Sequence, residues 1–117
     1  MSSTPSGDAP RVLVADDHED AVYIYEQFLS HHGLRVASAG DGYEALRKVS
    51  ELAPDVILLD LSMPKLDGWE TCRRLKADEQ LRHIPVIVVS AHAFKPAEDQ
   101  ARAAGCDVYL TKPVGLD

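Results

Sequence analysis

Three short runs of Val, Ile and Leu restrict the fold of this chain more than any other feature. They lie in residues 11–16, 55–60 and 85–90, which read RVLVAD, DVILLD and PVIVVS. None of them alternates apolar with polar residues, as a strand with one solvent-facing side does. Continuous apolar strands are typical of parallel sheets that are covered by helices on both faces.

Segments with apolar residues at helical spacing separate these strands. The predicted helices cover residues 19–32, 41–53, 68–77 and 96–104. Gly33, Pro54 and Gly105 end three of them, as expected for residues that stop a helix. Two further strands are expected at residues 34–39 and 108–111. Strands that alternate with helices through short links form right-handed βαβ units, so the sequence predicts a doubly wound parallel α/β sheet.

The length and composition are those of one folded domain. The chain has 117 residues, of which 45% are hydrophobic and 26% charged. Residues 1–10 are rich in Ser, Thr, Gly and Pro and are expected to be a flexible leader, with the domain at residues 11–117. Two cysteines are too few for a disulfide scaffold and are expected to be reduced thiols in the cytoplasm. No apolar run approaches the roughly 18 residues of a transmembrane helix, so no membrane partner is expected.

The charge balance excludes one large class of partners. Nineteen acidic residues face twelve Lys and Arg, for a net charge of −7. Binding to nucleic acid or to an anionic membrane requires a basic face, so neither is expected as the main activity. The acids are spread along the chain and do not form a tail. The function must therefore depend on particular acids at particular positions.

Polar and charged residues stand where the predicted strands end. Asp16 and Asp17 follow the first strand, Asp60 ends the third, Ser90 ends the fourth, and Lys112 follows the fifth. Open α/β sheets bind ligands at these carboxyl ends. If the first and third strands are neighbours, three carboxylates converge and need a cation, for which Mg²⁺ is suited. A lysine and a hydroxyl suit an anion, so the set indicates metal-assisted phosphoryl chemistry with a carboxylate nucleophile.

Each of these residues alone has an ordinary structural explanation. An Asp at the end of a strand often caps the next helix, and Asp17 fits that role. Asp60 fits it less well, because residues 61–64 do not begin a helix. Lys112 alone is a typical surface lysine, and Ser90 an ordinary hydroxyl at a strand end. Their joint occurrence at successive strand ends favours a functional site.

Five separated motifs carry a family resemblance. They are VLVADD at residues 12–17, PDVILLD at 54–60, Met63-Pro64 with Asp67-Gly68, VIVVSA at 86–91 and GCDVYLTKP at 105–113. With them, the sequence from about residue 11 to residue 113 resembles the receiver domain of two-component response regulators, the CheY-like superfamily. The resemblance implies a flavodoxin-like, five-stranded parallel sheet with strand order 2-1-3-4-5.

The resemblance also implies the central chemistry. Asp60 matches the phosphoacceptor, which attacks the phosphorus of a phosphohistidine on a histidine kinase or histidine phosphotransfer protein. Asp16 and Asp17 match the acidic pair that holds Mg²⁺, or Mn²⁺ in its place, with Asp17 as the more direct ligand. The backbone carbonyl of Ser62 matches a further ligand. Lys112 matches the cation that pairs with a phosphoryl oxygen.

Further positions match the conformational response of the family. Ser90 matches the hydroxyl that moves to bind the phosphoryl group, and Tyr109 the aromatic whose rotamer follows that move. Ser62 and His92 match positions that tune the lifetime of the phosphoryl group. The five histidines, His18 among them, show no spacing typical of zinc ligands, so zinc is not expected. The implied output is a protein target or a fused effector domain, with no catalysis beyond the domain's own phosphorylation and slow dephosphorylation.

Three other classes fit the sequence less well. A haloacid dehalogenase-type phosphatase needs a second acid two residues after its nucleophile, where Ser62 stands here. A flavodoxin-like electron carrier needs a polar, Gly-rich phosphate loop after the first strand, and residues 17–20 read DHED instead. A pseudo-receiver would lack part of the acid, hydroxyl and lysine set. A receiver fragment of a hybrid kinase or larger regulator stays an alternative.

The strand–helix alternation calls for a fifth helix after residues 108–111, but six residues follow Thr111. The sequence is cut from a longer protein, is a natural short form, or has this helix replaced by a partner. The first is favoured because residues 114–117 resemble the start of a helix. Without that helix, we expect an apolar face on the fourth and fifth strands. Such a face would lead to a homodimer or to lower stability than an extended chain has.

Overall fold

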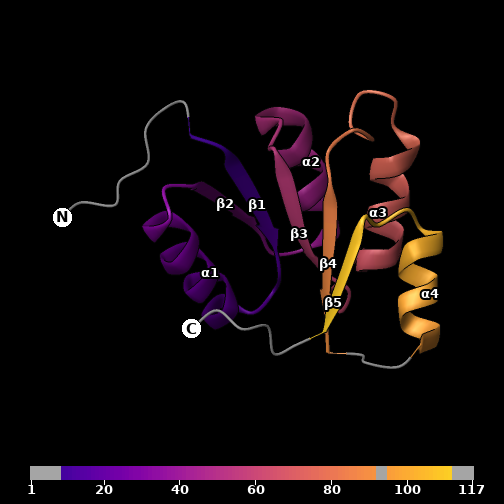
Figure 1. The fold of residues 1–117 in the computed structure, drawn as a ribbon. Helices are drawn as coiled ribbons and strands as arrows, with labels where there is room; N and C mark the ends of the chain where they lie inside the picture. Colours follow the sequence, from indigo (N-terminus) through magenta and orange to yellow (C-terminus); the bar gives the residue numbers. More distant parts are fainter. Residues whose placement is uncertain (1–8, 92–94, 112–117) are drawn as a thin grey trace.

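A computed structural model describes residues 9–91 and 95–111 of the chain (Figure 1). In order, its elements are β1 (Arg11–Ala15), α1 (Glu19–His31), β2 (Arg35–Ala39), α2 (Gly42–Leu52), β3 (Val56–Asp60), α3 (Gly68–Ala77), β4 (Val86–Ser90), α4 (Lys95–Ala103) and β5 (Val108–Thr111). The predicted helices and strands are confirmed, with ends that differ by one residue at most. Most of the expected leader, and the expected start of a fifth helix, lie outside the described residues.

The five strands form one parallel sheet in the order β2-β1-β3-β4-β5, which confirms the predicted fold class. From β1 the chain adds β2 on one side of the sheet and then β3, β4 and β5 on the other. In folds of this type, ligands bind at the strand ends beside this switch point, here between β1 and β3. The register brings the strand ends level: Asp60 pairs with Val89, and Ser90 pairs with Thr111. The residues at these ends therefore share one edge of the sheet.

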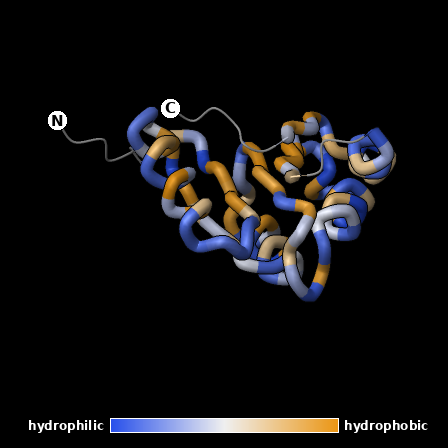
Figure 2. The backbone as a smooth tube through the Cα atoms, turned by 90° about the horizontal axis from the view of Figure 1, so that it is seen from below, coloured by the Kyte–Doolittle hydropathy of each residue, from blue (hydrophilic) through white to orange (hydrophobic). Residues whose placement is uncertain are grey.

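Helices cover the two faces of the sheet unequally (Figure 1). The larger core lies between the sheet and α2, α3 and α4, which contribute, among others, Ala45, Val49, Cys72, Leu75 and Ala101. The smaller core lies under α1, whose Tyr25 packs with Val12 and Val14 of β1. Figure 2 shows the apolar strands inside the fold and hydrophilic segments on the helices around them.

Side-chain caps fix where two helices begin. The Asp41 carboxylate accepts a hydrogen bond of 2.8 Å from the Glu44 backbone N–H at the start of α2. The Asp67 carboxylate accepts one of 2.9 Å from the Glu70 backbone N–H at the start of α3. Such caps satisfy amide groups that the first helical turn leaves without partners. The Asp67 cap fixes the start of α3, whose first residue, Gly68, lies against the strand end that carries Asp60.

The edge strand β5 is the least covered part of the sheet. Val108 and Leu110 are 40% and 42% exposed, which agrees with the apolar face that was expected on this strand. The expectation of an exposed face on β4 is wrong for Val89, which is only 4% exposed. Among the described residues, no helix is both long and apolar enough to cross a bilayer.

Candidate functional site

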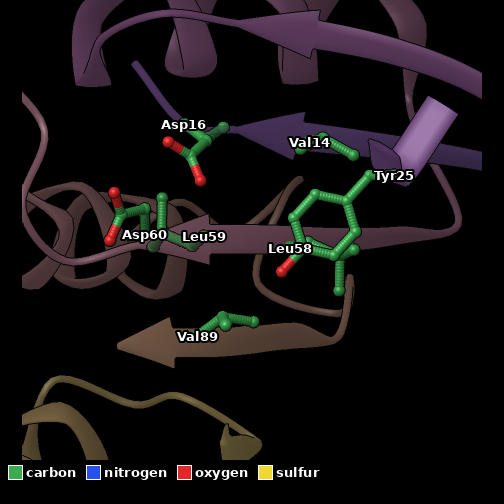
Figure 3. A pocket seen from close by; sticks show the side chains of 8 residues that line it. Val14, Asp16, Tyr25, Leu58, Leu59, Asp60 and Val89 are labelled. Carbon is green, nitrogen blue, oxygen red and sulfur yellow. The ribbon is translucent and has the colours of Figure 1, made fainter. Parts of the chain in front are cut away.

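Two buried carboxylates mark the carboxyl edge of the sheet. Asp16 directly follows β1 and Asp60 ends β3, and each is 4% exposed. Figure 3 shows them on neighbouring strands, side by side. Carboxylates are rarely buried this deeply, so two of them on neighbouring strand ends are typical of a functional site.

Asp17 and His18 complete this cluster from the turn that follows Asp16. One donor atom from each of Asp16, Asp17, His18 and Asp60 lies within 4.8 Å of the others. The Asp16 carboxylate also accepts a hydrogen bond of 2.9 Å from the His18 backbone N–H. That bond holds the turn in the shape that brings all four side chains together.

The alternative role of Asp17 as a helix cap is wrong. The N-cap residue of α1 is His18, and its side chain makes no capping hydrogen bond. Asp17 is exposed, and its carboxylate lies near the His18 ring, 3.2 Å from Nδ1. The ordinary structural explanation for this acid is therefore removed.

The donor set fits a hard divalent cation. Three carboxylates close together repel one another, and a cation relieves that repulsion. Carboxylate oxygens are the ligands that Mg²⁺ takes, usually with several waters. Asp16 and Asp60 are buried and Asp17 is exposed. A bound cation would therefore contact the two buried carboxylates on its protein side and remain accessible to water on the side of Asp17.

A small apolar cavity underlies the two buried carboxylates. Its walls include Val14, Leu58, Val89 and the ring of Tyr25, which reaches over the sheet from α1 (Figure 3). Charges interact more strongly beside such low-dielectric surroundings than they do in water. The cavity walls thus strengthen any cation or phosphoryl contact that Asp60 makes.

Among the other predicted site residues that the structure describes, Ser90 and Ser62 lie at the same edge, while Tyr109 lies inside β5. Ser90 ends β4 next to β3 and is fully buried. Tyr109 pairs with Val88 and packs against the core on the side of α3 and α4. Ser62 is exposed, and its backbone N–H donates a hydrogen bond of 3.3 Å to the Asp60 carboxylate. Lys112 and His92 lie outside the described residues.

Gly68 is a site-positioning residue whose role was not recognised from the sequence. Its backbone N–H donates a hydrogen bond of 3.0 Å to the Leu61 carbonyl. A Cβ at this position would lie 2.5 Å from the Asp60 carbonyl oxygen and 2.6 Å from the Leu61 Cα. Only a residue without a side chain lets α3 approach this strand end so closely.

His18 is the second residue that sequence spacing missed. Its ring belongs to the acid cluster, although no other histidine stands at a ligand spacing from it. The available signal was its position directly after the Asp pair at a strand end. Spacing rules for metal sites on helices and hairpins do not cover such a turn.

Comparisons with known proteins agree with the fold and show the family. Residues 12–117 match the family described as the response regulator receiver domain. The chain is 37% identical over 105 residues to the polar-differentiation response regulator DivK of Brucella ovis, covering 90% of this chain and 85% of DivK. The chain therefore belongs to the response regulator receiver family, whose members act in two-component signalling and are not classical enzymes.

Two solved structures resemble this one closely. The phosphorylated cyanobacterial phytochrome response regulator RcpA has a TM-score of 0.81 and 29% identity, covering 92% of this chain and 84% of that chain. The Mn²⁺-bound form of response regulator Rcp1 has a TM-score of 0.80 and 25% identity, covering 88% of this chain and 81% of that one.

Proposed function

We propose that the chain accepts a phosphoryl group on Asp60, with Mg²⁺ bound, and signals through the resulting change of conformation. The observation that carries the proposal is the convergence of Asp16, Asp17 and Asp60 at one edge of the sheet. Ser90 ends the adjacent strand at the same edge. The donor is a phosphohistidine on a histidine kinase or histidine phosphotransfer protein.

The transfer is a displacement at phosphorus. A carboxylate oxygen of Asp60 forms the new P–O bond while the P–N bond to the donor histidine breaks, and the donor imidazole leaves. Asp16, Asp17, Asp60 and the backbone carbonyl of Ser62 would hold Mg²⁺. The ion supplies positive charge to the oxygens of the transferred group.

Residues around Asp60 would stabilise and report the phosphoryl group. Lys112 pairs with one phosphoryl oxygen, and the Ser90 hydroxyl moves to donate to another. Tyr109, on the strand next to Ser90, changes rotamer as Ser90 moves. Ser62 and His92 set how fast water removes the phosphoryl group. Ser62 also leaves the position of a second phosphatase acid without a carboxylate, which disfavours a haloacid dehalogenase-type hydrolase.

The relatives support both parts of this proposal. RcpA is a response regulator in a phosphorylated form, and Rcp1 is one with Mn²⁺ bound. The same chemistry in this chain would use Asp60 and the acids beside it. The output would be a protein target or a fused effector domain.

Two further observations concern surroundings and partners. Burial, and then the neighbouring Cys106, raises the pKa of Cys72 to about 11, and both thiols are free, as suits the reducing cytoplasm.

Val108 and Leu110 form an exposed apolar edge. Through it, the chain would associate with a second copy, and sedimentation of a Leu110→Gln variant against wild type measures that association.

Phosphotransfer to the full chain tests the central proposal. With a phosphohistidine donor and Mg²⁺, label is expected on the wild type and not on Asp60→Asn. Asp55→Asn is a matched control, because Asp55 precedes the same strand at the opposite edge of the sheet. EDTA should abolish transfer. Label that persists on Asp60→Asn, or that transfers fully in EDTA, would refute the proposal.

A further inference from the structure

The imidazole of His18 lies among the proposed metal ligands. Its Nδ1 is 2.9 Å from Asp16 Oδ1, 3.2 Å from Asp17 Oδ1 and 3.9 Å from Asp60 Oδ2. The three carboxylates come from two neighbouring strand ends, and the ring reaches them from the first position after the Asp pair. His18 Nδ1 and one carboxylate oxygen from each of the three acids are therefore close enough to be ligands of one metal ion.

These separations match the edges of a coordination sphere. Two ligands that bind one ion at about 2.1 Å lie about 3.0 Å apart in an octahedral site and about 3.4 Å apart in a tetrahedral one. The distances from Nδ1 to Asp16 and Asp17, 2.9 Å and 3.2 Å, are close to these values. The longer distance to Asp60 lies between those of adjacent and opposite ligands. The four atoms can therefore serve one ion with small movements.

The conformation of the turn directs the ring toward the three carboxylates, where its Nδ1 contacts Asp16. His18 has an extended backbone (φ −94°, ψ 109°) and its side chain does not cap α1. The backbone N–H of His18 is held by Asp16, while its side chain remains 62% exposed. His18 Nδ1 is hydrogen-bonded to Asp16 Oδ1 at 2.9 Å, so coordination would exchange this bond for the ion and place the ring proton on Nε2. The backbone hydrogen bond that shapes the turn does not involve the ring, so it can persist when the ring exchanges Asp16 for an ion.

We infer that His18 makes this a mixed nitrogen and oxygen site that prefers a divalent transition-metal ion, of which Zn²⁺ is the probe, over Mg²⁺. Imidazole nitrogen suits Zn²⁺ and its neighbours in the transition series, whereas Mg²⁺ takes oxygen ligands. The inference rests on the proposed metal site of the receiver. The inference differs from the expectation that zinc does not bind, which was based on the spacing of the histidines.

The test compares two metals on the full chain. Calorimetry gives the dissociation constants of Zn²⁺ and of Mg²⁺ for the wild type and for His18→Ala. The ratio of Zn²⁺ to Mg²⁺ affinity is expected to fall about tenfold or more in the variant. His83→Ala, an exposed histidine in the segment before β4, should keep the wild-type ratio. Nitrogen NMR of the wild type should show the large shift of a coordinated nitrogen at His18 Nδ1 with Zn²⁺, and with Mg²⁺ only the smaller shift caused by a change in its hydrogen bond to Asp16.

A second variant separates coordination from hydrogen bonding. His18→Asn keeps a polar donor near Asp16 but lacks the imidazole, so it should lose the zinc preference as His18→Ala does. A wild-type ratio in either His18 variant, or an Nδ1 resonance that ignores Zn²⁺, would overturn the inference. Failure of the proposed function would be seen elsewhere, as absence of Mg²⁺-dependent phosphorylation of the wild type.

Discussion

Gly68 at the start of α3 lies so close to Asp60 that a Cβ there would stand 2.5 Å from the Asp60 carbonyl oxygen. The helix start thus positions the backbone of the proposed phosphoacceptor. We expect Gly68→Ala to lower the free energy of unfolding by about 1–3 kcal/mol, because the strand end must move to make room. Denaturant unfolding measures this loss, and phosphorylation should slow as Asp60 shifts.

Gly40→Ala is the matched control. A Cβ at Gly40 would have Glu44 Oε1 as a neighbour at 3.7 Å, an ordinary contact. This variant should unfold within about 0.5 kcal/mol of the wild type. Equal effects of the two substitutions would contradict the positioning role of Gly68.

Lys76 joins the end of α3 to the loop before β4 and to Asp107, just before β5. Its ammonium donates hydrogen bonds to the carbonyls of Arg82 and Ile84 and to the carboxylate of Asp107, at 2.9–3.0 Å. Lys76→Met keeps the side-chain length but removes all three. We expect the free energy of unfolding to fall by about 1–3 kcal/mol. Arg73→Met, which removes only an exposed ion pair with Glu70, should cost less, and a reversed order would contradict this role for Lys76.

The pH dependence of stability should report on Asp107. Burial acts to raise the pKa of this carboxyl, but hydrogen bonds from the Val86 N–H and Lys76 outweigh it, so the pKa lies below its usual 3.8. Asp107 therefore stabilises the fold above about pH 4, and this contribution is lost as the pH falls through the lowered pKa. Unfolding at pH 7 and at pH 2.5 should show a smaller difference between wild type and Asp107→Asn at the lower pH. A difference independent of pH would contradict the assigned contacts.

The sequence predicted the fold closely because local patterns determine it. Continuous apolar strands and helix-stopping residues placed every described element to within one residue, while the sheet order came from the family resemblance. The contact of Lys76 with Asp107 was not predictable, because the two residues are 31 positions apart and meet only in the folded chain. The close approach of Gly68 to Asp60 was not predictable either, because it depends on how α3 packs against the end of β3. The place of His18 depends on a single turn and one side-chain rotamer, which residue spacing does not encode.

Ser90 should respond when the site takes a phosphoryl mimic. Ser90 is buried at the end of β4, next to the strand that carries Asp60. New contacts between its hydroxyl and the added group should favour one of two conformations of the domain. Beryllofluoride with Mg²⁺ should shift the backbone NMR resonances of residues 91–95 and of Tyr109. Ser90→Ala should reduce the shift at Tyr109. An unchanged spectrum in this region would contradict the proposed switch.

The location of the phosphoryl group tests the proposed function most directly. After phosphorylation in Mg²⁺, borohydride reduces an aspartyl phosphate to homoserine, which peptide mass spectrometry assigns to one position. We expect homoserine at position 60 and at no other acid, since Asp60 is the buried carboxylate at the end of β3. Homoserine at position 16 or 17, or none at all in chain that carries the label, would contradict Asp60 as the phosphoacceptor.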